Sequence, residues 1–153
     1  MAGGGLLDNL DYSFVAGFED GSFEVKSSQP GGGGKTLRNQ FKILADFIKS
    51  IDIINMIPVK DKWMRSSESE DIDIRALSGN EDLWAVYLHR KDTADKRSVF
   101  EFELSPGSYS FNWLDTKTGE QTKNEIKDHP GGTAKITSPV FSEDIAVRIE
   151  KSK

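Results

Sequence analysis

The chain has 153 residues, of which 36% are hydrophobic, and a formal net charge of −5 at pH 7. This length suits one ordinary domain, or one small domain with an appendage. The acidic charge, without a lysine or arginine block, argues against a nucleic-acid partner. No segment approaches the roughly 20 apolar residues of a membrane span, and the absence of cysteine excludes disulfides and thiolate chemistry.

The N-terminal segment, MAGGGLLDNLDYSF, lacks the basic and apolar regions of a signal peptide, so the sequence leaves the localisation unknown. Carboxylates gather in this segment beside Tyr12, and paired carboxylates can hydrolyse glycosides or bind a cation. Loop carboxylates are more often solvated or capping groups, and both interpretations stay open. The residues in question are Asp8, Asp11, Glu19 and Asp20.

The next motif is PGGGGKT, residues 30–36, whose end resembles a nucleotide-binding P-loop. The P-loop requires glycine where Gln29 stands, and a buried strand where the polar residues 25–29 stand. We therefore expect no nucleotide site. The glycines are typical of a permissive turn that leads into a helix.

That helix is predicted over residues 36–53. Apolar side chains recur at steps of three and four, which places them on one broad helix face. Thr36 is the expected N-cap, and Pro58 cannot continue the helix. The face needs a large partner surface. Its members are Leu37, Phe41, Ile43, Leu44, Phe47, Ile48, Ile51 and Ile54.

Residues 70–150 alternate between apolar and polar positions, with turn signals between the alternating runs. This pattern predicts an antiparallel β-sandwich of about seven strands. Arg65–Asp71 is expected to be a solvated linker or the lead-in to a strand. The runs begin at residues 72, 84, 100, 109 and 145, with weaker strands at 121–126 and 133–137.

Three tryptophans and one tyrosine are possible sugar-stacking residues. Trp84 and Trp113 lie on the apolar sides of their strands and are predicted core residues. Tyr87 points the other way and is the better stacking residue. Trp63 either stacks on sugar or pins the helix to the sandwich. His89 and His129 lack zinc-type spacing, so neither a metal nor another cofactor is expected.

Several segments resemble a bacterial family of glycoside-hydrolase-like proteins. In that family an apiosidase-like TIM barrel precedes a β-rich domain named for collagen binding in collagenase-like proteins. The N-terminal segments GGGLLDNLDYSFVAGFEDGSFEV and PGGGGKTLRNQFKILADFIKSIDIINMIPVKD resemble the last barrel unit. The later segments LWAVYLHR, LSPGSYSFNWLDTKTGE and SPVFSEDIAVRIEK resemble the β-rich domain, and the hairpin at Trp113–Gly119 is the most recognisable piece.

The resemblance implies that this chain supplies one strand–helix unit of a barrel that needs eight. Residues 1–61 are then a barrel remnant and residues 62–153 an accessory sandwich that braces the missing barrel, in a parent family that is secreted or periplasmic. The chain by itself is expected to be non-catalytic and to contact polysaccharide in a binding role. The resemblance places Asp8, Asn9, Asp11, Tyr12, Glu19 and Asp20 on the substrate rim.

Two other functions stay open, namely an independent carbohydrate-binding module and a residual glycosidase. The helix face at residues 37–54 lacks a barrel neighbour, and exposed apolar patches favour association. We therefore expect this helix to form a homodimer or to dock on the sandwich.

Overall fold

The computed structural model describes residues 11–26, 32–59, 64–66, 71–79, 82–92 and 94–152. The predicted domain boundary at residue 62 lies outside this range. The described elements are α1 (Gly34–Lys49), the 3₁₀ helix η1 (Ile53–Asn55), β1 (Ile57–Pro58), β2 (Met64–Ser66), β3 (Ile72–Gly79), β4 (Leu83–Arg90), β5 (Val99–Leu104), β6 (Gly107–Asp115), β7 (Gln121–His129), β8 (Gly132–Thr137) and β9 (Asp144–Ser152). No helix among the described residues is long and apolar enough to cross a membrane.

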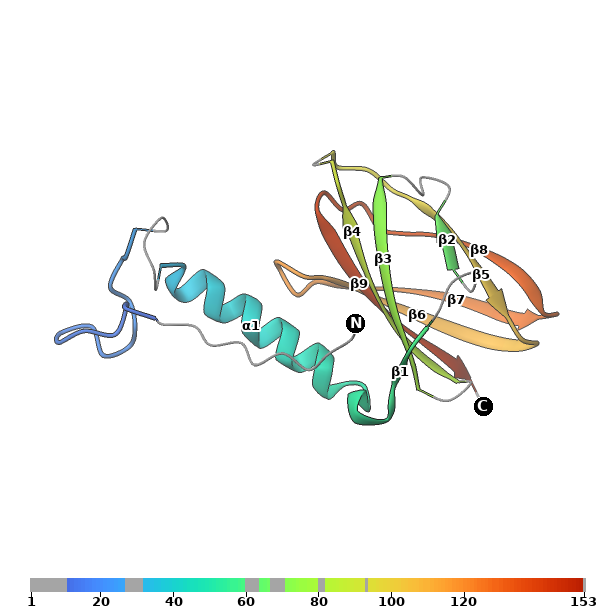
Figure 1. Cartoon of the computed structure of the whole chain (residues 1–153), viewed down its shortest axis with the longest axis horizontal. Coiled ribbons are helices and arrows are strands. Elements are labelled where there is room, and N and C mark those ends of the chain that lie inside the picture. The colour runs from blue at the N-terminus through green and yellow to red at the C-terminus, as the bar shows by residue number, and fades with distance from the viewer. Residues whose placement is uncertain are drawn as a thin grey trace.

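The strands form two antiparallel sheets that pack face to face, which confirms the predicted β-sandwich (Figure 1). The larger sheet has six strands in the order β1-β3-β4-β9-β6-β7, and the smaller has three in the order β2-β5-β8. Each predicted strand is present. The two weaker predictions extend to residues 129 and 132 as β7 and β8.

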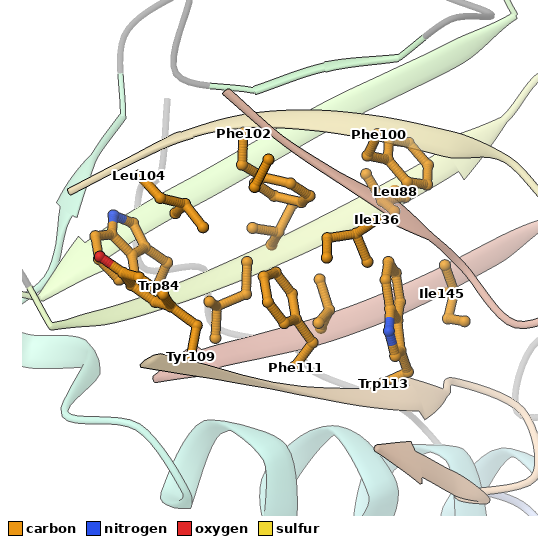
Figure 2. Packing of buried hydrophobic residues seen from close by; sticks show 14 of the residues in the cluster. Trp84, Leu88, Phe100, Phe102, Leu104, Tyr109, Phe111, Trp113, Ile136 and Ile145 are labelled. Atoms are coloured by element: carbon orange, nitrogen blue, oxygen red, sulfur yellow. The ribbon is translucent and has the colours of Figure 1, made fainter. Parts of the chain in front are cut away.

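Period-two alternation builds the core, because alternate residues of each strand face the opposite sheet. Phe102 of β5 meets Phe111 of β6 edge to face, with ring centroids 5.6 Å apart (Figure 2). Trp84 and Trp113 are buried in the same cluster, as predicted. These aromatic side chains and the aliphatic residues between them form the apolar core that holds the two sheets together.

The hairpin between β6 and β7 is organised by Asp115. Its carboxylate accepts hydrogen bonds from the backbone N–H groups of Lys117 and Thr118, both at 2.8 Å. Gly119 closes the turn at φ 80°, a left-handed conformation that favours glycine. A Cβ at this glycine would lie 3.2 Å from the side chain of Ile43, so the turn also makes room for α1.

The helix starts earlier than predicted, and the N-cap prediction at Thr36 is wrong. Gly33 is the N-cap at φ 104°, and no side chain caps the helix. The adjacent Gly34 also has a positive φ of 44°, so the glycines do form the expected turn. Because two glycines accept this conformation without steric cost, the helix can begin two residues before Thr36. The helix ends at Lys49, four residues before the predicted end.

Helix α1 packs on the outer face of the six-stranded sheet. Phe47 joins Ile51, Met56 and Ala85 in a second, smaller apolar cluster. The guanidinium of Arg148 on β9 donates to the carbonyl oxygen of Ser50 at the helix C-terminus, at 3.3 Å. The expected docking of the helix on the sandwich is therefore present at its C-terminal half.

The helix face formed by Phe41, Leu44, Phe47 and Ile48 is only partly covered by the sandwich, and its predicted burial between the sandwich and a barrel stays a prediction. No residue of α1 is fully buried, and Leu44 is 49% exposed. A hollow separates Leu37, Phe41, Leu44 and Ile48 from the sheet, so only part of the apolar face packs directly on it. Met64–Ser66 pairs with β5 as a strand of the smaller sheet, so the segment predicted as a solvated linker or strand lead-in begins within a strand.

We expect Phe111→Ala to lower the free energy of unfolding by about 3–5 kcal/mol, because it removes a fully buried ring from the centre of the core. Urea denaturation followed by tryptophan fluorescence measures this loss. Val99→Ala, at a partly exposed position of β5, is the matched control and should change stability by less than about 0.5 kcal/mol. Equal effects of the two changes would contradict the assigned core.

Candidate functional site

Helix α1 rests on the outer sheet face along a ridge, with one hollow on each side. Ile43 and Phe47 of the helix and Leu114 of β6 line both hollows and therefore form the ridge. We call the larger hollow, of about 1200 Å³, the apolar groove. The smaller one, of about 520 Å³, is the polar cleft. The two differ in chemistry because they border different strands.

The apolar groove combines the free flank of α1 with the centre of the outer sheet face. Leu37, Phe41, Leu44 and Ile48 line it from the helix. These positions follow steps of four and three, so they form one continuous stripe along α1. The sheet adds Leu77, Tyr87 and Ala146, among others.

Tyr87, the predicted sugar-stacking residue, stands inside the apolar groove and is 41% exposed. Its hydroxyl donates to the carboxylate of Asp144 at 2.8 Å, and the Thr116 hydroxyl donates to the same carboxylate. Burial, followed by the bond to Asp144, raises the pKa of Tyr87 to about 12. Its ring thus lies beside α1 and is fixed by its hydroxyl. Sugar stacking at Tyr87 stays a prediction.

The polar cleft lies on the other flank of α1, above β9, β6 and β7. Arg148, Asn112 and Lys123 are register partners across these three strands and form one row. Ser110 and Glu150 form the next row, and Lys42, Asp46 and Ser50 border the cleft from the helix. The alternating pattern of the sequence predicts that the strand residues of this cleft are polar and exposed. It does not predict that α1 lies beside them.

The acidic N-terminal loop is held to α1 by Arg38. The guanidinium of Arg38 forms a salt bridge with Asp11 at 2.5 Å and donates to the carbonyl oxygen of Gly21 at 2.8 Å. It also donates to the hydroxyl of Ser13 at 2.9 Å and lies 4.9 Å from the ring centroid of Phe14. Sequence reasoning missed Arg38, since its partners lie at least 17 residues away.

Asp11 is the most strongly fixed of the predicted rim residues. It accepts hydrogen bonds from the backbone N–H and the hydroxyl of Ser13 and from Arg38. These bonds, the Ser13 hydroxyl first, lower the pKa of Asp11 from 3.8 to about 2. This carboxylate therefore stays ionised at neutral pH, and its oxygens are engaged by hydrogen bonds from Ser13 and Arg38.

Glu19 and Asp20 cap their own loop. Glu19 accepts from the backbone N–H of Gly17, and Asp20 from that of Ser22, each at 3.0 Å. The Gly17 bond lowers the pKa of Glu19, and hydrogen bonding by the Ser22 side chain, followed by its backbone N–H, lowers the pKa of Asp20. Among the described residues no cluster of three metal-ligating side chains occurs.

The same loop presents several exposed aromatic rings, of which sequence reasoning singled out only Tyr12. Tyr12 and Phe14 are each about half exposed, and Phe18 and Phe23 meet edge to face at 5.4 Å. The loop lies at the end of α1 that is remote from the sandwich, whereas Tyr87 is on β4 within it (Figure 1). The structure thus separates Tyr87 from the predicted rim residues. Three other predicted site residues, Asp8, Asn9 and Trp63, lie outside the described residues.

Parts of two solved glycoside hydrolase structures have a similar fold. One solved structure, described as a glycoside hydrolase, has a TM-score of 0.54 at 20% identity, over 82% of this chain and 26% of its own. A second, a glycoside hydrolase family 5 structure from Bacteroides vulgatus, has a TM-score of 0.52 at 18% identity, over 81% of this chain and 25% of its own. No protein-family model and no curated protein matches the chain.

At these identities the likeness concerns the fold. It supports the glycoside-hydrolase-like resemblance at that level, and the chain corresponds to about a quarter of each of these structures. The resemblance to a domain named for collagen binding stays a prediction.

We expect NMR titration to place the pKa of Asp11 near 2 and to show a rise in Ser13→Ala, which removes the leading hydrogen bond. Because the folded pKa is lowered, the stabilisation is present above the unfolded value of about 4 and is lost as the pH falls toward 2. Asp20 in the same variant is the internal control, since its bond comes from Ser22. An unchanged Asp11 pKa would contradict the assigned hydrogen bonds.

Proposed function

We propose that the chain is the non-catalytic accessory part of a glycoside-hydrolase-like protein, in which the sandwich and α1 together brace a TIM barrel. The observation that carries this proposal is the apolar groove. The helix side of this groove is the part of the apolar face of α1 that the sandwich leaves uncovered. The likeness to about a quarter of two glycoside hydrolases supports it.

The groove suits a protein neighbour for physical reasons. Leu44 is half exposed in the middle of the stripe, and Ile53 and Pro58 extend the apolar lining past the helix end. Exposed apolar patches of this kind mark interaction surfaces in soluble proteins. A barrel wall laid on the groove would bury the stripe while the ridge at Phe47 holds α1 on the sandwich.

The carboxylates of the N-terminal loop support a non-catalytic role for this chain. A glycosidase general acid needs a raised pKa, and its partner carboxylate must face the same sugar bond. The pKa values of Asp11, Glu19 and Asp20 are instead lowered by local hydrogen bonds. Asp11 is also paired with Arg38, so its oxygens are engaged.

We expect the purified chain to release no reducing sugar from plant or bacterial polysaccharides. Colorimetric detection of reducing ends over a long incubation measures this. Release that disappears in Asp11→Asn would contradict the proposal and would establish the alternative of a residual glycosidase.

Bracing is tested with an apiosidase-like barrel supplied in trans. We expect the wild-type chain to co-elute with the barrel in size-exclusion chromatography, and Leu44→Asp to abolish the complex because it places a charge in the groove. Val140→Asp, at an exposed valine before β9, is the matched control and should leave the complex intact. Failure of the wild-type chain to bind, or equal binding by Leu44→Asp, would refute the proposal.

The homodimer through residues 37–54 would use the same stripe, so barrel and second copy compete for it. Sedimentation velocity of the wild-type chain and of Leu44→Asp without the barrel measures self-association. We expect a dimer that dissociates in the variant and in the presence of the barrel.

An independent carbohydrate-binding module is the second function considered, and the half-exposed ring of Tyr87 favours it. Tyr87→Ala should abolish glycan binding if that ring is the stacking platform.

A further inference from the structure

We propose that the polar cleft, on the flank of α1 opposite the apolar groove, binds a segment of a neutral oligosaccharide. The inference rests on the proposed association with a glycoside-hydrolase-like protein for the ligand class. The site itself comes from the side chains that the fold brings together on β9, β6, β7 and α1.

The floor of the cleft is a row of hydrogen-bonding side chains that spans three strands. Arg148, Asn112 and Lys123 are direct register partners, so they stand about 5 Å apart across the sheet. The Asn112 amide contacts Ser110 only at 3.5 Å, the limit for a hydrogen bond. Its amide groups are thus available to a ligand that both donates and accepts, as a sugar hydroxyl does.

Arg148 adds a donor that the protein does not satisfy. Its Nη1 donates to the Ser50 carbonyl oxygen and its Nη2 pairs with Glu150 at 2.5 Å. Its Nε is buried and has no hydrogen-bond partner in the described part of the chain. A buried donor without a partner costs free energy, so a ligand oxygen at this point would be favourable.

The charges around the cleft favour a neutral ligand. Lys42 pairs with Asp46 at 2.5 Å, and Lys123 pairs with Glu125 at 2.6 Å. Together with the pair at Arg148, these contacts compensate the cations that line the cleft. Each of these cations is already paired with a carboxylate, so the cleft offers little electrostatic attraction to an acidic sugar. A neutral sugar hydroxyl can accept from the cation and donate to the carboxylate of such a pair.

The wall of the cleft supplies the apolar contact that sugar rings also need. Ile43 and Phe47 of α1 line it opposite the polar floor. The volume of about 520 Å³ suits a short segment of chain. Because the apolar groove lies on the other flank of α1, a barrel bound in that groove leaves the polar cleft open.

The test uses the purified full chain on an array of neutral and uronate-containing oligosaccharides, followed by NMR titration of the ¹⁵N-labelled chain with the best neutral hexasaccharide. We expect the side-chain amide signals of Asn112 and Gln121 to shift on titration. Asn112→Ala should weaken binding by about tenfold, because it removes the central hydrogen bonds of the row. Gln121→Ala should weaken it in the same direction.

Two control variants make the result specific. Asn124→Ala changes the same residue type on β7, at a register position opposite buried Phe111 and so on the other face of the strand, and should bind like wild type. Val140→Asp changes an exposed side chain that does not line the cleft and should also bind like wild type. Absence of binding to every glycan, a preference for uronates, or loss in Tyr87→Ala with retention in Asn112→Ala would overturn the proposal.

These measurements need no barrel, so their failure is distinguishable from failure of bracing. A chain that binds the barrel but no glycan refutes only the cleft. A chain that binds glycan through Asn112 but no barrel refutes only the bracing role.

Discussion

The outer face of the six-stranded sheet is apolar at its centre, and the rest of the molecule depends on this constraint. Ala85, Leu114 and Ala146 point away from the sandwich core and are nevertheless buried. Exposure of this apolar patch to water would cost free energy. Packing of Phe47 of α1 against it removes part of that cost. The helix is thereby fixed on a sheet to which no strand pairing connects it.

The narrow contact of α1 with the sheet explains why two unlike surfaces arise side by side. A helix about 10 Å wide touches a twisted sheet along a line and leaves both flanks open. On the flank toward β3 and β4 the open surface is mainly apolar and includes Leu44 and Tyr87. On the flank toward β7 it carries Asn112 and Lys123. One flank therefore suits a protein wall, and the other suits a hydroxyl-rich ligand.

The N-terminal loop follows a different rule, because local hydrogen bonds determine its structure. Glu19 and Asp20 bond to backbone groups two residues away, and Asp11 bonds to Ser13 and Arg38. These contacts hold the carboxylates ionised while the neighbouring aromatic rings stay exposed. In the described part of the loop, the pKa values of Asp11, Glu19 and Asp20 are all lowered, which is the opposite of the shift that a general acid needs.

The sequence by itself determined the sandwich and its core, because period-two alternation decides which side of a strand is apolar. The sequence correctly predicted that Trp84 and Trp113 are buried in the core and that Tyr87 is exposed on the outer face. Each prediction follows from the alternation of the two faces along a single strand. It could not place the helix start at Gly34 or the Arg38 anchor, which depend on backbone conformation and on partners distant in sequence. Only the tertiary structure divided the broad face of α1 into a covered ridge and an open stripe. Helical periodicity identifies the apolar side chains, but the position of α1 on the sheet decides which of them are covered, and that position depends on contacts between residues distant in sequence.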